Sequence, residues 1–381
     1  MKVVVAIDSF KGSLSSPDVG NAAKRGILRA MPEAQVQVYP LADGGEGTVH
    51  ALIDGMGGQL CTAEVTGPLG DPVESTYGIL KDNTTAVMEM ASAAGITLVP
   101  PAQRNPMDTT TFGVGEMIRD AIARGCRKFI VGIGGSATND GGAGMLMALG
   151  YELLDAAGRP IPRGARGLKA LAQIKKEHVL PELSECEFLI ACDVANPLCG
   201  SQGCSAVYGP QKGADEDTAA WMDQALAHYA QVAMQYFPGA DPDHPGAGAA
   251  GGLGFAFLTF TNAALKPGIE IVIQETGLET AIRQADIVLT GEGRLDGQTA
   301  MGKAPVGVAA LAEKYQKPVL AVAGSITREA SICHRAGIHA YFPIVRGVTT
   351  LEEAMAPENA SENMADAVEE IFRLVEFCRR Y

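Results

Sequence analysis

Glycines, hydroxyls and an acid are packed into one short stretch near the middle of the chain, at residues 132–142. The stretch reads Gly-Ile-Gly-Gly-Ser-Ala-Thr-Asn-Asp-Gly-Gly and directly follows the apolar run 128–131, which predicts a buried strand. Glycines keep side-chain bulk away from the backbone, so its N–H groups can converge on an anion, and Ser136 and Thr138 add hydroxyl donors. Asp140 in such a loop suits a metal ion, an accepted proton or a capping bond. The pattern indicates phosphate chemistry.

Four further loops combine glycine with charged side chains. One such loop is usually a structural turn, but turns can be built without charge, so five in one chain favour a shared chemical role. The net charge of −14 means that an anionic ligand must be met by local cations. The four loops are residues 8–13, 42–48, 209–213 and 290–298, and the cations of interest are Lys11, Lys212, Arg294 and Lys303.

Several carboxylates lie just after predicted strands, where catalytic acids are often found. Asp193 follows one strand, and an Asx turn is its structural alternative. Glu292 and Asp296 flank Arg294, and a local surface ion pair is the alternative there. Asp8 ends the first strand of the chain, where it could equally serve as a cap or turn acceptor.

Two nucleotide-binding fingerprints nearly match. Residues 297–304 fit G-x-x-x-x-G-K but end in alanine, so the hydroxyl that holds Mg²⁺ in a Walker loop is missing. Residues 132–137 fit the G-x-G-x-x-A pattern of dinucleotide sites, with Asp155 roughly where the ribose-binding acid belongs. However, residues 139–142 interrupt what should be the first turns of a helix. A nicotinamide-dependent oxidoreductase of a small hydroxy acid is therefore a weaker alternative.

The composition limits the partners. A strongly negative chain repels a phosphate backbone, which argues against nucleic-acid and anionic-membrane partners. The eight cysteines include no C-x-x-C pair and fit a reducing compartment. The amino terminus becomes charged too early for a signal peptide. We therefore expect a cytoplasmic protein.

The two ends of the chain share one pattern and the middle has another. At the ends, short apolar runs alternate with helical patterns, which predicts parallel strands joined by right-handed crossovers. In the middle, three closely spaced strands predict an antiparallel meander, followed by two more strands and a long amphipathic helix over 215–237. The expected strands are 2–7, 35–41, 286–290, 318–323 and 340–343 at the ends, and 59–66, 73–80, 84–90, 128–133 and 187–192 in the middle.

The expected fold is therefore α/β with two domains. Five alternating strands fit a flavodoxin-like parallel three-layer sandwich, which would be discontinuous and formed by residues 1–62 and 275–381. Residues 63–274 would form an inserted mixed α/β domain. Ligands of such sheets bind beyond the carboxyl ends of the strands, so we expect the active site in the interdomain cleft.

Taken together and in order, five motifs closely resemble those of the bacterial class I glycerate kinase family, over essentially the whole chain. The resemblance implies phosphorylation of D-glycerate by ATP with Mg²⁺, with 2-phosphoglycerate as the more usual product than 3-phosphoglycerate. D-Glycerate and ATP are then the partners, and a homodimer is an open option. The motifs are Asp-Ser-Phe-Lys at 8–11, Ala-Asp-Gly-Gly-Glu-Gly-Thr at 42–48, Gly-Ile-Gly-Gly-Ser-Ala-Thr at 132–138, Gly-Pro-Gln-Lys-Gly-Ala at 209–214 and Thr-Gly-Glu-Gly-Arg at 290–294.

The chemistry of phosphoryl transfer suggests which residues meet the phosphates and the metal. A kinase must hold two anions and offset the charge that spreads over the transferred group. We expect phosphate contacts from Lys11 and Lys212 and from the central Gly-rich loop, at Gly134, Gly135, Ser136 and Thr138. Mg²⁺ prefers one or two carboxylates, and the candidates are Asp193 with Glu292 or Asp296.

The substrate needs a cation and a proton acceptor. Arg294 has the planar shape for bidentate capture of the glycerate carboxylate, and Asp8 and Ser9 complete the expected substrate contacts. The attacking hydroxyl needs a base, and either Asp193 or Asp43 would serve. A non-catalytic small-anion sensor on the same fold is the alternative outside enzymes, and turnover with ATP separates the two.

Overall fold

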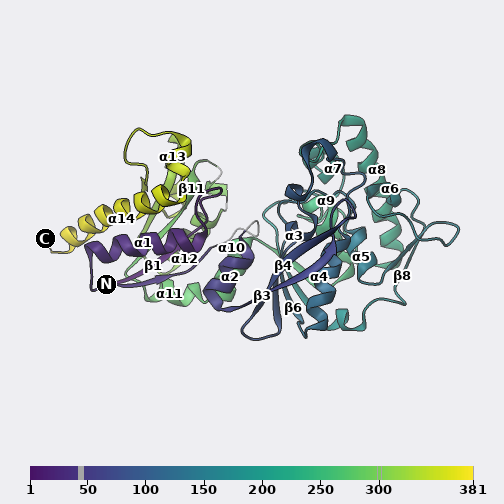
Figure 1. Cartoon of the computed structure of the whole chain (residues 1–381), viewed down its shortest axis with the longest axis horizontal. Helices are drawn as coiled ribbons and strands as arrows, with labels where there is room; N and C mark the ends of the chain where they lie inside the picture. Colours follow the sequence, from purple (N-terminus) through teal and green to yellow (C-terminus); the bar gives the residue numbers. More distant parts are fainter. Residues whose placement is uncertain (42–46, 298, 302, 381) are drawn as a thin grey trace. The chain divides into compact units, whose positions relative to one another are not determined.

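The computed structural model describes residues 1–41, 47–297, 299–301 and 303–380. The chain divides into two compact units, whose elements are labelled in Figure 1. The first unit comprises Met1–Asp43, His50–Gly57 and Gly268–Tyr381, and so contains both ends of the chain. The second comprises Gly44–Val49 and Gly58–Pro267.

The first unit is built on a parallel five-stranded sheet in the order β2-β1-β11-β12-β13. Strand β1, from the amino terminus, pairs directly with β11, so one sheet is assembled from both ends of the chain. Its residues are almost all buried and apolar, as expected for a parallel strand covered on both faces. The strands are β1 (Lys2–Ile7), β2 (Gln35–Val38), β11 (Ile287–Leu295), β12 (Val319–Ile326) and β13 (Ala340–Pro343).

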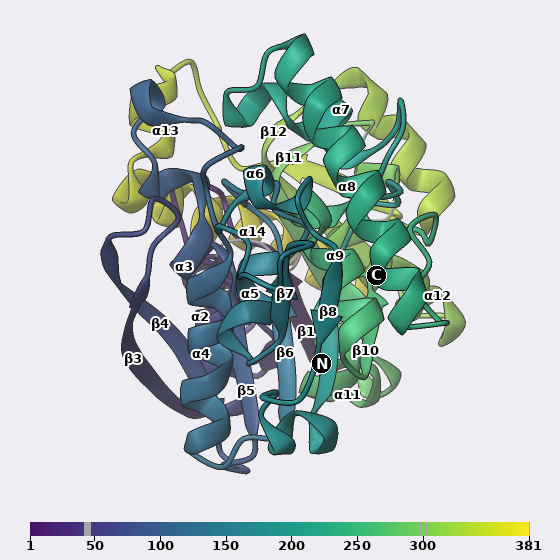
Figure 2. The same cartoon turned by 90° about the vertical axis from the view of Figure 1, so that its right-hand side faces the viewer.

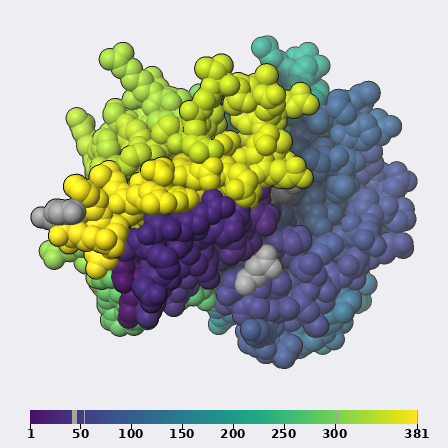
Figure 3. Space-filling model, turned by 60° about the vertical axis from the view of Figure 1, so that its left-hand side comes forward, coloured from purple at the N-terminus to yellow at the C-terminus, as the bar shows by residue number. Residues whose placement is uncertain are grey.

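Helices cover both faces of this sheet. On one face α1 and α14 run side by side, as Figures 1 and 3 show, and pack over Val3 and Val5. A side chain at Gly26 of α1 would come within 2.2 Å of the Ala365 carbonyl oxygen, so glycine permits this close approach. Val4 alternates with Val3 and Val5 and faces the opposite side, where α12 packs. The helices of this unit are α1 (Ser16–Ala30), α10 (Gly268–Thr276), α11 (Leu278–Gln284), α12 (Ala304–Lys314), α13 (Leu351–Met355) and α14 (Pro357–Arg380), with 3₁₀ helices η5 (Thr299–Met301) and η6 (Arg328–Ala336).

One expected loop is instead a strand. Residues 290–295 were expected to leave the sheet, but β11 continues to Leu295 and stays paired with β12. Gly291 serves a close approach here and not a turn, since a side chain at this position would come within 2.1 Å of the Val322 carbonyl oxygen. Glu292 and Arg294 therefore lie in the sheet, with their directions fixed by its pleat.

The second unit is built on a mixed six-stranded sheet in the order β10-β9-β6-β5-β4-β3. The expected antiparallel meander is present as β3, β4 and β5, and β6, β9 and β10 continue it in parallel; Figure 2 shows β3 to β6 as neighbouring arrows. The strands are β3 (Gly58–Thr66), β4 (Pro72–Leu80), β5 (Thr85–Glu89), β6 (Lys128–Gly132), β9 (Glu187–Ala191) and β10 (Ala263–Lys266), with a separate two-stranded sheet of β7 (Glu152–Leu154) and β8 (Gln173–Lys175).

Aromatic rings form much of the second core. Phe129 of β6 stacks on Phe188 of β9 with 4.7 Å between ring centroids, and Phe188 also contacts Phe257 of α9. The long helix α8 lies within the expected range 215–237, and Asp215 caps its start by accepting the Thr218 N–H at 2.8 Å. The helices of this unit are α3 (Ala91–Ala94), α4 (Phe112–Ala123), α5 (Ala143–Ala148), α6 (Ala165–Leu168), α7 (Cys204–Tyr208), α8 (Glu216–Tyr236) and α9 (Ala249–Phe260), with 3₁₀ helices η1 (Ile96–Leu98), η2 (Pro101–Gln103), η3 (Pro181–Glu185) and η4 (Pro210–Lys212).

The edges of the units fall a few residues from the expected boundaries at 62/63 and 274/275. Strand β3 pairs with β4 along its whole length from Gly58, which keeps residues 58–62 with the second unit. Helix α10 begins at Gly268 and packs against α12, which keeps it with the first. Helix α2 (Thr48–Met56) has its first two residues in the second unit. In the described ranges, no helix is both long and apolar enough to cross a membrane.

Replacing Gly291 with alanine should weaken the pairing of β11 with β12. The new methyl group would overlap the Val322 carbonyl, and overpacking of this kind costs about 1–3 kcal/mol. The measurement is the shift of the urea unfolding midpoint. Gly293→Ala is the matched control in the same strand, because its methyl group would meet its nearest neighbour, Phe10 Cα, at an ordinary 3.4 Å. Equal stability of the two variants would contradict this account.

Candidate functional site

In the second unit, four parallel strands end at one edge of the sheet. Their register aligns Glu89 of β5 with Gly132 of β6, Gly132 with Ala191 of β9, and Ala191 with Lys266 of β10. The central Gly-rich loop leaves this edge after Gly132, and Asp193 follows two residues after Ala191. Loops at the carboxyl ends of parallel strands are where α/β sheets bind ligands. The Gly-rich motif and the candidate carboxylate Asp193 thus belong to one edge of the sheet.

The start of the Gly-rich loop exposes its backbone. Gly134 and Gly135 are exposed, and Gly135 has φ of +72°, which lets successive N–H groups turn to the same side. The loop is held from behind, because Ile96 N–H donates to the Gly135 carbonyl and Ala137 N–H to the Ala94 carbonyl. Within the described chain, the N–H groups of residues 134–136 donate to no backbone carbonyl. This arrangement suits an anion.

Lys212 lies beneath this loop and not on its surface. Its side chain is only 2% exposed, and its ammonium group donates to Ser136 Oγ and to the Thr138 carbonyl, both at 2.7 Å. Burial lowers the pKa of Lys212 to about 8, although nearby Cys204 and Asp140 act in the opposite direction. The sequence predicts direct phosphate contact for Lys212. In the structure its ammonium group is hydrogen-bonded to Ser136 and Thr138, two of the other predicted phosphate-binding residues.

Asp140 has the capping role among the three considered from the sequence. Its carboxylate is fully buried and accepts hydrogen bonds from the N–H groups of Thr111, Gly142 and Gly144 at 2.9, 3.1 and 3.2 Å, and from the Thr111 hydroxyl. Burial raises its pKa, and these bonds favour the ionised form. Asp140 therefore ties the starts of α4 and α5 to the end of the loop.

Glycines allow the loop to pack against α9. A side chain at Gly251 would lie 2.1 Å from the Thr138 carbonyl oxygen, and one at Gly142 would lie 2.4 Å from Ala256 Cβ. The Gly141 N–H donates to the Gly251 carbonyl at 2.9 Å. The last part of the loop is thus fixed by its neighbours and buried, in contrast to the exposed first part.

Two other acids of this edge differ in exposure. Asp193 is exposed, while Glu89 is half-buried and accepts the Val49 N–H at 2.9 Å. Glu89 therefore has the partner that a buried carboxylate needs. Lys266, whose carbonyl accepts the Cys192 N–H at 2.9 Å, ends β10 at the same edge and was not singled out from the sequence.

In the first unit, a second group of charged residues lies at the carboxyl end of the parallel sheet. Asp8 follows β1, its N–H donates to the Gly291 carbonyl at 2.9 Å, and so it occupies the register position beside Glu292. Both residues are largely buried. Asp8 also accepts the N–H of half-buried Ser9 at 2.7 Å, which holds its carboxylate close to the backbone. Lys11 follows and is exposed.

Glu292 is held by a threonine that the sequence reasoning missed. Thr299 is fully buried and its hydroxyl donates to Glu292 Oε1 at 2.5 Å, while Lys303 Nζ lies 3.7 Å from Glu292 Oε2. Burial raises the pKa of Glu292, opposed by Thr299 and Lys303. Thr299 also exchanges hydrogen bonds with Asp296, three residues earlier, in a local turn. The three-residue spacing between Asp296 and Thr299 is the one signal in the sequence that could have indicated a role for Thr299.

Two predicted residues remain, Arg294 and Asp43. Arg294 is exposed over 66% of its side chain, and its Nε is 3.7 Å from Asp296 Oδ2, which is the local ion pair considered as an alternative. This distance leaves the guanidinium group accessible to a carboxylate ligand. Asp43 lies outside the described residues.

Within the described chain, no group of three or more His, Cys, Asp or Glu side chains is arranged to hold a metal ion. Mg²⁺ in kinases is bound by one or two carboxylates and completed by phosphate oxygens and water. By its chemistry, each of exposed Asp193 in the second unit and part-exposed Asp296 in the first could be one such ligand. The oxygens of Glu292 lie beside Thr299 and Lys303.

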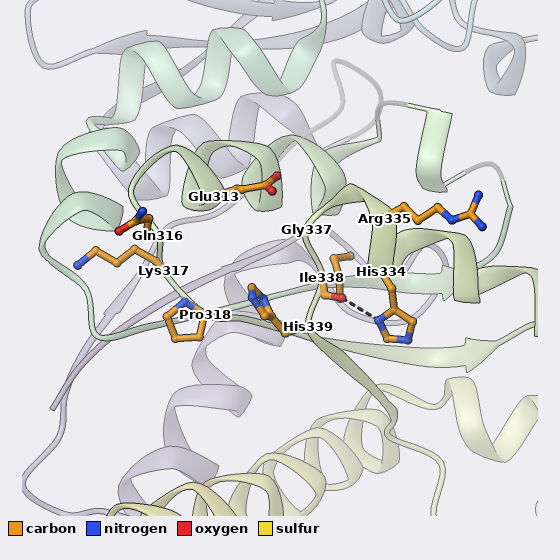
Figure 4. A pocket seen from close by; sticks show the side chains of 9 residues that line it. All are labelled: Glu313, Gln316, Lys317, Pro318, His334, Arg335, Gly337, Ile338 and His339. Carbon is orange, nitrogen blue, oxygen red and sulfur yellow. Dashed lines mark hydrogen bonds between the residues drawn. The ribbon is translucent and has the colours of Figure 1, made fainter.

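A cavity of about 430 Å³ in the first unit lies away from these residues. It is found at the amino ends of β12 and β13, the edge opposite to Asp8 and Glu292. Helices α12 and η6 end there, so their last carbonyls make basic neighbours favourable without a ligand. Figure 4 shows its lining, in which His334 Nδ1 is 2.8 Å from the Ile338 carbonyl oxygen: Glu313, Gln316, Lys317, Pro318, His334, Arg335, Gly337, Ile338 and His339.

The two sheets carry charged or Gly-rich segments at the carboxyl ends of their parallel strands, and α/β proteins as a class bind ligands at such edges. The glycerate kinase family model matches residues 3–376, and the chain belongs to this family. The glycerate kinase of Bacillus subtilis (strain 168) is 47% identical over 97% of this chain and 97% of its own length. The glycerate 2-kinase of Escherichia coli (strain K12) is 47% identical over 96% of this chain and 97% of its own.

A solved structure is similar over the whole chain. The crystal structure of a candidate glycerate kinase 2 from Salmonella typhimurium LT2 has a TM-score of 0.92 and 45% identity, and covers 100% of both chains. The resemblance seen in the motifs is thus confirmed, the chain is an enzyme, and its membership of a kinase family implies use of ATP. The non-catalytic sensor and the oxidoreductase are not supported. In the dinucleotide pattern, helix α5 begins only at Ala143, and Asp155 lies beside the separate two-stranded sheet, bonded to Arg159.

Thr299→Val should destabilise the first unit. Valine has the shape of threonine but cannot donate to Glu292, and a buried acceptor left without its donor costs about 1–3 kcal/mol. Thr299→Ser keeps the hydroxyl and is the matched control. The measurement is the unfolding free energy from urea titration. A Thr299→Val protein as stable as Thr299→Ser would show that the hydroxyl is not holding Glu292.

Proposed function

We propose that this enzyme transfers the γ-phosphoryl group of ATP to the 2-hydroxyl of D-glycerate. The oxygen of that hydroxyl forms a bond to the γ-phosphorus, the bond between this phosphorus and the β–γ bridging oxygen of ATP breaks, and the hydroxyl proton passes to a carboxylate. The products are 2-phosphoglycerate and ADP. The observation that carries the proposal is the 47% identity, over nearly the whole chain, to a relative named glycerate 2-kinase.

The exposed part of the Gly-rich loop supports a role in phosphate binding. Phosphoryl transfer relies on positioning and on donors aimed at phosphate oxygens. Backbone N–H groups at Gly134 and Gly135 and the Ser136 hydroxyl could supply such donors, and the buried ammonium of Lys212 adds a positive charge behind them. Thr138 would contribute through the path of the backbone, since its side chain is fully buried.

The carboxyl edge of the first unit supports a role in binding glycerate. Arg294 is exposed and has the geometry for a carboxylate, and Lys11, Ser9 and Asp8 follow the neighbouring strand. Mg²⁺, when bound with ATP, offsets the charge on the transferred group. Asp193, with Asp296 or Glu292, is the proposed carboxylate set for it, and Asp193 or Asp43 is the proposed base.

The flavodoxin-like classification, the cellular location, the oligomeric state and the position of the active site also remain proposals. The strand order β2-β1-β11-β12-β13 corresponds to the 2-1-3-4-5 order of flavodoxin-like sheets and supports that classification of the first unit. A cytoplasmic location, a homodimer and a cleft between the domains as the active site remain predictions from the sequence.

The proposed reaction is tested with purified protein, D-glycerate, ATP and Mg²⁺. We expect ADP release that depends on glycerate, measured in a coupled assay. The proton-coupled ³¹P spectrum of the product should show a doublet, because the 2-phosphate is attached through a carbon that carries one hydrogen. A triplet would identify 3-phosphoglycerate instead, and no glycerate-dependent ADP from folded protein would refute the kinase assignment.

Asp193→Asn tests whether the charge of Asp193 takes part in the reaction. Asparagine keeps the shape and the local turn bond but can neither accept a proton nor bind Mg²⁺ well. If Asp193 is the base, kcat should fall by roughly 10²–10⁴-fold with little change in ATP binding. If it binds the metal, the Mg²⁺ concentration for half-maximal activity should also rise. Activity within a few-fold of the parent at saturating Mg²⁺, with an unchanged melting temperature, would show that Asp193 only shapes a local turn.

A further inference from the structure

We propose that Lys212 is a positioning residue that acts through Ser136, fixing the Ser136 hydroxyl so that its proton points to a phosphate oxygen of the nucleotide. Lys212 then does not touch the substrate. The inference deepens the proposed function and rests on it in one respect, the binding of an anionic phosphate at the Gly-rich loop.

One hydrogen bond between Lys212 and Ser136 has a fixed direction. A lysine ammonium carries three donors and no acceptor, so the 2.7 Å bond between Lys212 and Ser136 must use a lone pair of Ser136 Oγ. The hydroxyl proton of Ser136 is then left for another acceptor. Among the described residues no acceptor for it is found. Ser136 is nevertheless 92% buried, since its exposed fraction is 8%, so its hydroxyl proton needs a partner.

Ser136 lies beside two other donors of the same loop. It follows Gly134 and Gly135, which are exposed and whose N–H groups donate to no described backbone carbonyl. A hydroxyl proton beside two such N–H groups completes a set of three donors for one anion. The second bond of Lys212, to the Thr138 carbonyl at 2.7 Å, fixes the other side of the loop. Lys212 thus holds both the donor and the backbone that carries it.

The charge of Lys212, and so the pH, decides whether Ser136 must act as its acceptor. Charged Lys212 forces Ser136 to act as its acceptor, whereas a neutral amine has a lone pair that could accept the Ser136 proton and turn it away from the ligand. Burial lowers the pKa of Lys212 to about 8, and the titratable groups that act on it are Cys204 of α7 and Asp140 of the loop. A bound phosphate favours the charged form and raises this pKa. Binding above pH 8 should therefore take up a proton.

The test is MgATP binding by calorimetry without glycerate, in buffers of different ionisation enthalpy, between pH 7 and 9.5. For the parent enzyme we expect proton uptake that grows above pH 8 and an affinity that falls over the same range. Lys212→Met should abolish the proton uptake. Ser136→Ala should weaken binding at pH 7 by about 10-fold or more, as expected for a lost hydrogen bond to a charged group. The double variant should bind MgATP almost as tightly as the single variant with the lower affinity, because both changes remove the same interaction.

Lys169→Met is the control, because Lys169 is an exposed lysine of the same unit that lies over the Trp221 ring. It should keep the proton uptake and the affinity of the parent. Should Lys212→Met fail to unfold cooperatively, Ser136→Ala decides alone and must show both weaker binding and smaller proton uptake. Parent-like proton uptake in Lys212→Met, or independent and additive losses in the two variants, would overturn the inference. Absence of MgATP binding by the parent would overturn the proposed function as well, whereas MgATP binding without glycerate turnover would affect only the substrate assignment.

Discussion

The burial of Asp140 is the constraint on which the second unit depends. A carboxylate with no exposure is tolerated only if donors surround it, and here the N–H groups of Thr111, Gly142 and Gly144 do so. These donors come from the starts of two helices and from the loop itself. The path of the Gly-rich loop is therefore fixed at its far end before any ligand binds. Removing the charge or one donor would disturb all three segments together.

The same loop changes character along its length. Its far end is buried and packed so closely on α9 that only glycine fits at Gly142 and Gly251. Its near end, at Gly134 and Gly135, is exposed. Lys212 lies beneath the loop and donates to the Thr138 carbonyl, between the exposed near end and the buried far end. Because Lys212 is buried, it brings a positive charge close to the exposed donors without being a surface cation. A positive charge placed in low dielectric acts on a bound anion more strongly than one in water, at a cost in stability.

The first unit uses strand pairing for a comparable purpose. Because β11 stays paired with β12 past Gly291, Glu292 projects from a strand whose direction the sheet determines. Thr299 then fixes one carboxylate oxygen and Lys303 lies near the other. A charged group held in this way loses little conformational entropy when a ligand arrives. The exposed Arg294, two residues further on, is held less tightly, because its Nε lies 3.7 Å from Asp296 Oδ2 and 66% of its side chain is exposed.

Much of the fold was decided by the sequence alone. The apolar runs of β1 and β13, the meander β3–β5 and the capped start of α8 follow from local hydrophobic period and capping chemistry, which need no distant partner. The prediction that Gly134, Gly135 and Ser136 bind an anion also came from a local sequence pattern. The extension of β11 could not be predicted from local pattern, because the sequence Gly-Glu-Gly predicts a turn and only the pairing with β12 makes it a strand. Three features of the site depend on residues far apart in the sequence or on which side chains become buried. They are the burial of Lys212, the capping role of Asp140 and the contact of Thr299 with Glu292. Tertiary structure decided these, since desolvation and hydrogen-bond pairing are properties of the packed neighbourhood and not of the residue types.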